Sequence, residues 1–115
     1  MAEIIIDWTQ LRQFWELMED DGESVEELVQ TFLSDAPTQL AKFKGALVES
    51  DNQELGRVAH TLKGSSATMG AQAFAELCRV VEHAVKQGED RDFAADVLAI
   101  ENSYKELEDV LRNWR

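Results

Sequence analysis

The 115-residue chain has the usual size of one domain, so we expect a single module that fills residues 1–115. Acidic residues outnumber basic ones 23 to 11, and the formal net charge of −12 argues against nucleic acid or an anionic membrane surface as the main partner. The single cysteine excludes a disulfide framework or a multi-cysteine zinc site and indicates a reducing, cytoplasmic compartment.

The N-terminal segment predicts a short helix rather than a signal peptide. It opens with "MAEIIIDW", which lacks a basic start and a small-residue cleavage pattern. No later segment approaches the roughly 20 apolar residues that a membrane span requires. Asp7 followed by Gln10 is typical of a helix start. The apolar face that follows comprises Trp8, Leu11, Phe14, Trp15 and Met18.

Four longer helices are predicted by apolar residues at 3.6-residue spacing, and no segment alternates with the period of a strand. The first runs from Ser24 to about residue 49, and Pro37 inside it predicts a kink or two nearly collinear helices. The second opens at the capping residue Asp51 and ends at Gly70, and the third ends at Gly88. The last runs from about residue 93 to the end of the sequence.

Each predicted helix has one apolar face, which we expect to form the core. The four faces comprise, in chain order, Val25, Val29, Phe32, Ala36, Leu40, Phe43 and Leu47; Leu55, Ala59, Leu62, Ser66 and Met69; Phe74, Leu77, Cys78, Val81 and Val85; and Phe93, Val97, Ile100, Tyr104, Leu107, Leu111 and Trp114. Amphipathic helices with short connections predict an all-α, antiparallel four-helix bundle, with the short N-terminal helix covering one end.

His60 stands apart because helix geometry turns it away from the core. At about 100° per residue it points about 140° from Leu55, so the imidazole is expected at the surface. An exposed histidine alone is more often a solvated side chain without a role. Its own face, however, holds no other large side chain and comprises Gln53, Gly56, His60, Gly64 and Ala67.

The glycines on this face predict contact with another protein. Each interior glycine costs roughly 1 kcal/mol of helix stability relative to alanine. A plain surface helix gains nothing from that cost, whereas a face that a partner's backbone must approach closely does. We therefore expect Gly56, Gly64 and Ala67 to lie at a partner-binding surface around His60.

Basic residues lie beside His60 in an otherwise acidic chain. Arg57 and Lys63 are three residues away on either side, which makes them its neighbours on the helix surface. A neutral imidazole is a nucleophile, and nearby cations hold phosphoryl oxygens by charge-assisted hydrogen bonds. This combination suits transient phosphorylation of His60, with Arg57 at the partner-binding surface.

Glu82 is expected to lie level with His60 on the next helix. If the hairpin turns at Gly70 and Ala71, residues equally distant from the turn lie at the same height. Glu82 is then placed to accept a hydrogen bond from one ring nitrogen and leave the other free to attack. An ordinary exposed glutamate is the alternative. Lys86 would extend the basic patch without an essential role.

The stretch "HTLKGSSATMGAQAFAELCRVVE", from His60 to Glu82, resembles the signature of histidine-containing phosphotransfer (HPt) domains. That signature reads His, any residue, Leu, Lys, Gly, Ser, Ser, then a Gly four positions later, and a Cys followed by a Glu or Gln in the next helix. The match is dense over the signature, and the remaining helices agree in general layout, so the resemblance covers effectively the whole chain.

The resemblance implies a role for each residue of the motif. His60 would be the phosphoacceptor, phosphorylated at its outer nitrogen, and Lys63 would lie near the phosphoryl group. Gly64 would clear space for the partner, and Ser65 and Ser66 would support the helix. Members of the family relay a phosphoryl group between aspartates of receiver domains, often from a hybrid sensor kinase to a response regulator. The receiver would supply the phosphoaspartate and Mg²⁺, so no metal or cofactor is expected in this chain.

Other chemistries fit the sequence less well. There is no glycine-rich phosphate loop, so neither an ATP site nor autophosphorylation is expected. Neither His60 nor His83 has a Glu three residues before it, as a di-iron bundle requires. Cys78 on the apolar face is expected in the core, and His83 is expected to be solvated or half-buried.

Two classes of function remain open. One is a phosphocarrier of a two-component phosphorelay, not an enzyme, acting as a cytoplasmic monomer. The other is a non-phosphorylated bundle that binds a receiver or another signalling protein through the same face. A third, weaker alternative is the substrate domain of a larger kinase. The intact motif favours the first over the second, while Met1 and the lack of a linker at either end favour a free-standing protein over the third.

Overall fold

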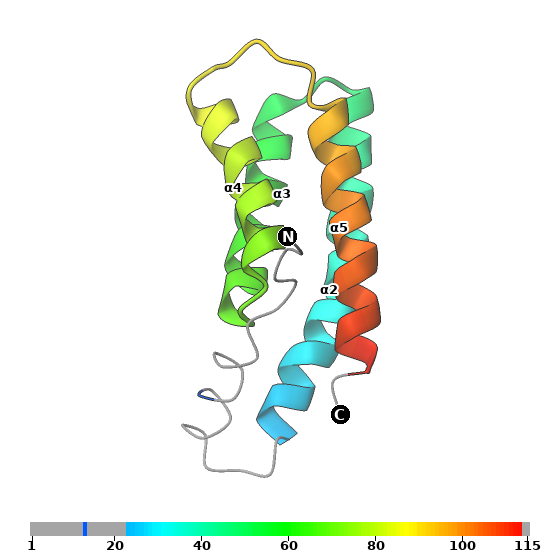
Figure 1. Cartoon of the computed structure of the whole chain (residues 1–115). Helices are drawn as coiled ribbons and strands as arrows, with labels where there is room; N and C mark the ends of the chain where they lie inside the picture. Colours follow the sequence, from blue (N-terminus) through cyan, green and yellow to red (C-terminus); the bar gives the residue numbers. More distant parts are fainter. Residues whose placement is uncertain (1–12, 14–22, 114–115) are drawn as a thin grey trace.

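The computed structural model describes residue 13 and residues 23–113 of the chain. Within these residues there are no strands and four long helices: α2 (Glu23–Val48), α3 (Asn52–Thr68), α4 (Gln72–Lys86) and α5 (Ala94–Arg112) (Figure 1). None of the four is both long and apolar enough to span a membrane. The N-terminal helix predicted over residues 8–18 lies outside the described residues except for Gln13, and Trp114 also lies outside them.

The four helices form an antiparallel bundle in which each one packs against two neighbours (Figure 1). α3 and α4 form a hairpin and make the most extensive contacts of any pair, while α2 and α5 lie side by side next to that hairpin. The predicted all-α, four-helix fold is confirmed for the described part of the chain. The α3–α4 hairpin carries the residues of the candidate site.

The apolar faces predicted from the sequence meet in one core. On α3 the five predicted positions are at most 1% exposed: Leu55, Ala59, Leu62, Ser66 and Met69. The buried hydroxyl of Ser66 donates to the carbonyl of Leu62 at 2.6 Å, which satisfies it inside the helix. Val58 is also fully buried, although its position was not assigned to the predicted face. On α4, Leu77 and Val85 are only half-buried.

Aromatic side chains from three helices meet at the centre of this core. The rings of Phe32, Phe74 and Tyr104 lie with their centroids 6.0–6.3 Å apart, in tilted or edge-to-face arrangements. Such pairs contribute about 0.5–1.5 kcal/mol each beyond the area that they bury. The cluster therefore ties α2, α4 and α5 together around the hairpin.

The ends of α3 and α4 follow from local chemistry. Asp51 caps α3, since its side chain accepts a hydrogen bond from the backbone N–H of Glu54 at 3.1 Å. After α3, Gly70 takes a φ of 80°, and the N–H of Ala71 donates to the carbonyl of Ser66 at 3.0 Å. Gly88 plays the same part after α4, with a φ of 66°. The predicted ends at Gly70 and Gly88 are confirmed, because only glycine adopts such angles without strain.

Pro37 lies inside a single continuous helix, so the predicted alternative of two separate helices is wrong. Proline removes one backbone hydrogen bond and disturbs the preceding turn. Leu33, Ala36 and Leu40 on either side of it are all buried, whereas Pro37 itself is exposed. Packing of these neighbours on the core therefore holds both halves of α2 in one helix.

Candidate functional site

His60 lies in the middle of α3 with its side chain 69% exposed. Ala59 beside it is fully buried, so the helix directs its apolar face inward and its imidazole outward. Gly64, one turn later, is also exposed, and an added Cβ there would meet no atom within 4 Å. The predicted surface position of His60 is confirmed, and there is open space beside it at Gly64.

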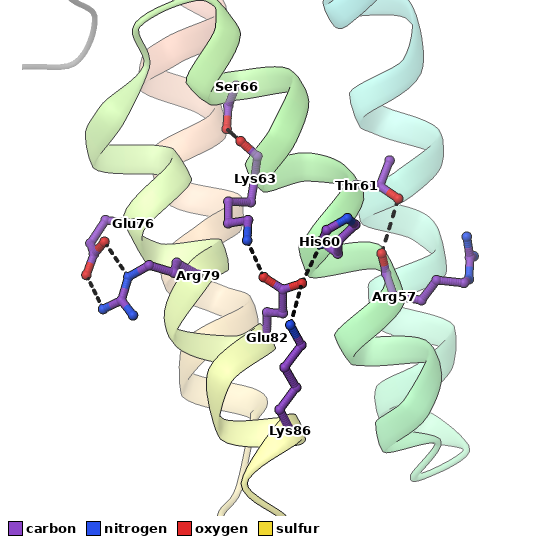
Figure 2. A network of polar contacts seen from close by, with 9 residues as sticks. All are labelled: Arg57, His60, Thr61, Lys63, Ser66, Glu76, Arg79, Glu82 and Lys86. Atoms are coloured by element: carbon purple, nitrogen blue, oxygen red, sulfur yellow. Dashed lines mark hydrogen bonds and ion pairs between the residues drawn. The ribbon is translucent and has the colours of Figure 1, made fainter.

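Glu82 lies at the centre of the polar contacts around His60 (Figure 2). Its Oε2 atom lies 2.5 Å from Nδ1 of His60, and its Oε1 atom accepts a hydrogen bond from Nζ of Lys63 at 2.5 Å. Nζ of Lys86 lies 3.7 Å from Oε2 and approaches from the side opposite Lys63 (Figure 2). The prediction that Glu82 pairs with one ring nitrogen is confirmed, and the alternative of an exposed glutamate is wrong, since its side chain is only 7% exposed.

Opposing effects act on the pKa of Glu82. Burial raises the pKa, because a carboxylate loses its hydration inside the protein. Hydrogen bonds from Lys63 and His60, together with their charge, lower the pKa and outweigh burial. The net pKa lies below the ordinary value of 4.5, so Glu82 is ionised at neutral pH and accepts hydrogen bonds from both neighbours.

Replacing Glu82 with Gln is expected to lower the free energy of unfolding by about 1–3 kcal/mol at pH 7, because Lys63 loses its buried partner. The folded-state pKa of Glu82 is lowered, so the stability from its ionised form is complete well above pH 4.5 and is lost as the pH falls through the folded-state value. The difference between wild type and Glu82→Gln should therefore shrink toward pH 3. Urea unfolding from pH 7 to pH 3 measures it, and a constant difference would contradict this electrostatic role.

The contact with Glu82 makes the two ring nitrogens of His60 chemically different. Nδ1 faces the carboxylate and, in a neutral ring, its N–H donates a hydrogen bond to Oε2 of Glu82. Nε2 then carries the lone pair on a largely exposed side chain. The arrangement presents one unprotonated nitrogen to an incoming electrophile and stabilises positive charge that develops on the ring.

Gly56 has a structural role that the sequence did not reveal. A Cβ at this position would lie 2.9 Å from Cγ1 of Val85 on α4, closer than real contacts allow. Gly56 therefore lets α3 and α4 pack closely one turn before His60, a packing role that the sequence did not predict. Gly56 still lines a shallow hollow beside His60, so contact with a partner there stays a prediction.

Arg57 does not supply its charge to His60 as predicted. Its guanidinium pairs with Glu54 at 2.5 Å, and its side chain extends away from the imidazole (Figure 2). Lys86 lies beside the site, 3.7 Å from Oε2 of Glu82, where the sequence predicted it to extend the basic patch without an essential role. Its spacing of four residues from Glu82 on one helix was the available signal.

The remaining predicted positions lie where the motif puts them. Ala67 is half-buried and borders a second shallow hollow together with Lys63 and Gly64. The hydroxyl of Ser65 donates to a carbonyl one turn earlier on α3. Cys78 is fully buried, and burial raises the pKa of its thiol to about 12, which confirms it as a core residue. His83 is exposed, as expected.

The structure defines a class of small all-α proteins, helical bundles with an exposed histidine in the middle of one helix. Comparison with known proteins identifies the family within this class. Residues 27–113 match the family model described as Hpt domain. The chain is 34% identical over 80 residues to the phosphorelay intermediate protein YPD1 of Saccharomyces cerevisiae, which covers 69% of this chain and 48% of YPD1. The chain thus spans about half the length of that curated relative.

Solved structures agree with the family match. The crystal structure of histidine-containing phosphotransfer protein B (HptB) from Pseudomonas aeruginosa PAO1 superposes with a TM-score of 0.86 and 28% identity, covering 96% of this chain and 94% of HptB. The HPT domain of a hybrid histidine kinase from Shewanella has a TM-score of 0.78 at 19% identity, over 94% and 91% of the two chains, and supports the fold alone. The chain belongs to the Hpt domain family.

Proposed function

We propose that this chain is a phosphocarrier that accepts a phosphoryl group on Nε2 of His60 and passes it between aspartates of receiver domains. The observation that carries this proposal is the orientation of the imidazole. Nδ1 is held at 2.5 Å by the buried carboxylate of Glu82, while the side chain is 69% exposed. A phosphoaspartate on a partner therefore meets an unprotonated nitrogen held on a packed helix.

The transfer step follows from this orientation. The Nε2 lone pair forms a bond to phosphorus as the bond between phosphorus and the aspartate oxygen breaks. The electron pair of that bond leaves with the aspartate carboxylate, and the imidazole ring gains a positive charge. The proton stays on Nδ1, facing Glu82, whose negative charge stabilises the ring in the product. Transfer to the acceptor aspartate is the reverse of this step.

Lys63 would hold the phosphoryl oxygens during transfer. Its Nζ atom contacts Oε1 of Glu82, while His60 contacts Oε2 of the same carboxylate (Figure 2). Its side chain is 32% exposed, so it can turn outward to a bound group. Phosphoryl transfer depends mostly on positioning and on charge stabilisation, and an ammonium group serves both. Gly64 beside it leaves space for the receiver's surface.

The partners and setting of this activity are part of the same proposal. We propose a receiver domain of a hybrid sensor kinase as one partner and a response regulator as the other. The lack of a glycine-rich phosphate loop in the sequence supports a carrier that has no ATP site and depends on its partners for catalytic carboxylates and Mg²⁺. The net charge of −12 supports a chain that binds no nucleic acid, and the single, buried cysteine supports a cytoplasmic setting. A monomeric state is part of the same proposal.

Labelling by a phosphorylated receiver tests this proposal. Mixing the protein with a radiolabelled receiver and Mg²⁺ should give an acid-labile, base-stable phosphate on wild type and none on His60→Gln. The imidazole nucleophile is absent from that variant, and His83→Gln serves as the matched control that keeps the label. A label that survives His60→Gln would overturn the proposal. Receiver binding without labelling of wild type would favour a non-phosphorylated interaction module instead.

A further inference from the structure

Two lysines share one buried carboxylate beside His60. Lys63 donates to Oε1 of Glu82 at 2.5 Å, whereas Lys86 lies 3.7 Å from Oε2, the atom that also contacts His60. When the imidazole is neutral, the cluster of Glu82, Lys63 and Lys86 holds one negative and two positive charges. A single cation neutralises Glu82, so the second positive charge is in excess before phosphorylation.

Phosphorylation of His60, on which this inference rests, changes that balance. The phosphoryl group carries roughly two negative charges one helical turn from Lys63, while the ring gains one positive charge, so the site becomes more negative by about one charge. If Lys63 turned to the phosphoryl oxygens and no other cation replaced it, the only positive group beside Glu82 would be the phosphorylated ring, whose charge the phosphoryl group already balances. The site as a whole would then be one positive charge short, which is costly for a carboxylate that is buried from water.

We propose that Lys86 is a reserve counter-ion that takes over Glu82 when Lys63 turns to the phosphoryl group on His60. The ring then keeps its hydrogen bond from Nδ1 to Glu82 throughout the transfer. After phosphorylation Lys86 pairs with the carboxylate and Lys63 pairs with the phosphoryl group. The positive charge that is in excess before phosphorylation is then balanced by the phosphoryl group.

The surroundings of Lys86 suit this exchange. Its side chain is 69% exposed, against 32% for Lys63, so it changes position with little loss of packing. It lies four residues after Glu82 on α4, which keeps its ammonium group within reach of the carboxylate. The other basic side chains of these two helices near the site, Arg57 and Arg79, each pair with a glutamate three residues earlier.

A double-substitution cycle on the full chain tests the exchange. The donor is phosphoramidate, a small molecule that needs no docking surface. Lys63→Met and Lys86→Met should each slow the labelling of His60 only severalfold, because the remaining lysine serves Glu82. The double variant should be slower than the product of the two single effects by about tenfold, as for residues that share a partner. Lys86→Arg should keep the wild-type rate.

The second measurement is which ring nitrogen of His60 carries the proton. A general loss of positive charge from the surface should not change it. In ¹⁵N NMR of the unphosphorylated protein, protonation of Nδ1 should persist in both single variants. It should be lost in the double variant, because Glu82 without either lysine takes up a proton and its O–H then donates a hydrogen bond to Nδ1 instead of accepting one from it. The matched control is Lys105→Met on α5, an exposed lysine with the same change in charge, which should leave both readouts unchanged.

Independent effects of the two lysines on the labelling rate, or an unchanged tautomer in the double variant, would overturn the exchange. Failure of the proposed function gives a different result, in which wild-type His60 is labelled neither by phosphoramidate nor by a receiver. The tautomer measurement does not require phosphorylation, so it still decides between shared and independent action of the two lysines on Glu82.

Discussion

Gly64→Gln is expected to reduce phosphotransfer from a receiver by roughly 100-fold while the helical circular dichroism stays nearly unchanged. An added Cβ at Gly64 meets nothing within 4 Å, so the longer side chain disturbs no internal packing and improves helix propensity. It does project into the space beside His60, where a receiver's backbone would approach under the proposed function. The loss should therefore fall on docking, not on folding.

Two controls separate docking from chemistry at Gly64. Phosphoramidate is small enough to pass the new side chain, so Gly64→Gln should be labelled by it at close to the wild-type rate. Gly45→Gln is the matched substitution on α2, since Gly45 is also exposed with nothing within 4 Å of an added Cβ, and it should transfer normally. Normal transfer from a receiver to Gly64→Gln would show that no partner surface comes close to this residue.

Gly56→Ala is expected to lower the free energy of unfolding by up to about 2 kcal/mol, although alanine is the better helix former. The gain in helix propensity is about 1 kcal/mol, whereas overpacking a well-filled contact costs about 1–3 kcal/mol. The added methyl group would lie 2.9 Å from Cγ1 and 3.3 Å from Cβ of Val85. Valine is stiff at its first side-chain torsion, so the helices have to separate. Urea denaturation measures the change.

The same substitution at other positions provides the comparison for Gly56. Gly45→Ala and Gly64→Ala meet no neighbouring atom and should stabilise the protein by up to about 1 kcal/mol each. Val85→Ala removes the two methyl carbons, so adding Gly56→Ala to that variant should be neutral or stabilising. If Gly56→Ala stabilises the wild-type chain, the close approach of α3 and α4 at this point is not required.

Much of the fold and of the candidate site could be predicted from local rules. The 3.6-residue spacing placed the buried faces of α3 and α5, and glycines with positive φ fixed the ends at Gly70 and Gly88. The turn at Gly70 also allowed Glu82 to be placed level with His60. In an antiparallel hairpin, residues equally distant from the turn lie at the same height. Short-range geometry was sufficient for each of these.

The remaining features depend on contacts between helices that the spacing along one helix does not reveal. Gly56 lies on the same face as His60, and only the position of Val85 on α4 shows that it serves internal packing. Arg57 is as close to His60 in sequence as Lys63 is, yet Glu54 on the preceding turn binds it. The contact of Lys86 with the site depends on the burial of the Glu82 carboxylate between the two helices, which the sequence does not reveal.

The phosphorylated atom is the most direct test of the central claim. In long-range ¹H–¹⁵N NMR spectra of protein labelled by a receiver, we expect the phosphoryl group on Nε2 of His60, with Nδ1 still protonated and facing Glu82. A phosphoryl group on Nδ1, or on any residue other than His60, would contradict the role assigned to Glu82 and to the exposed face of α3.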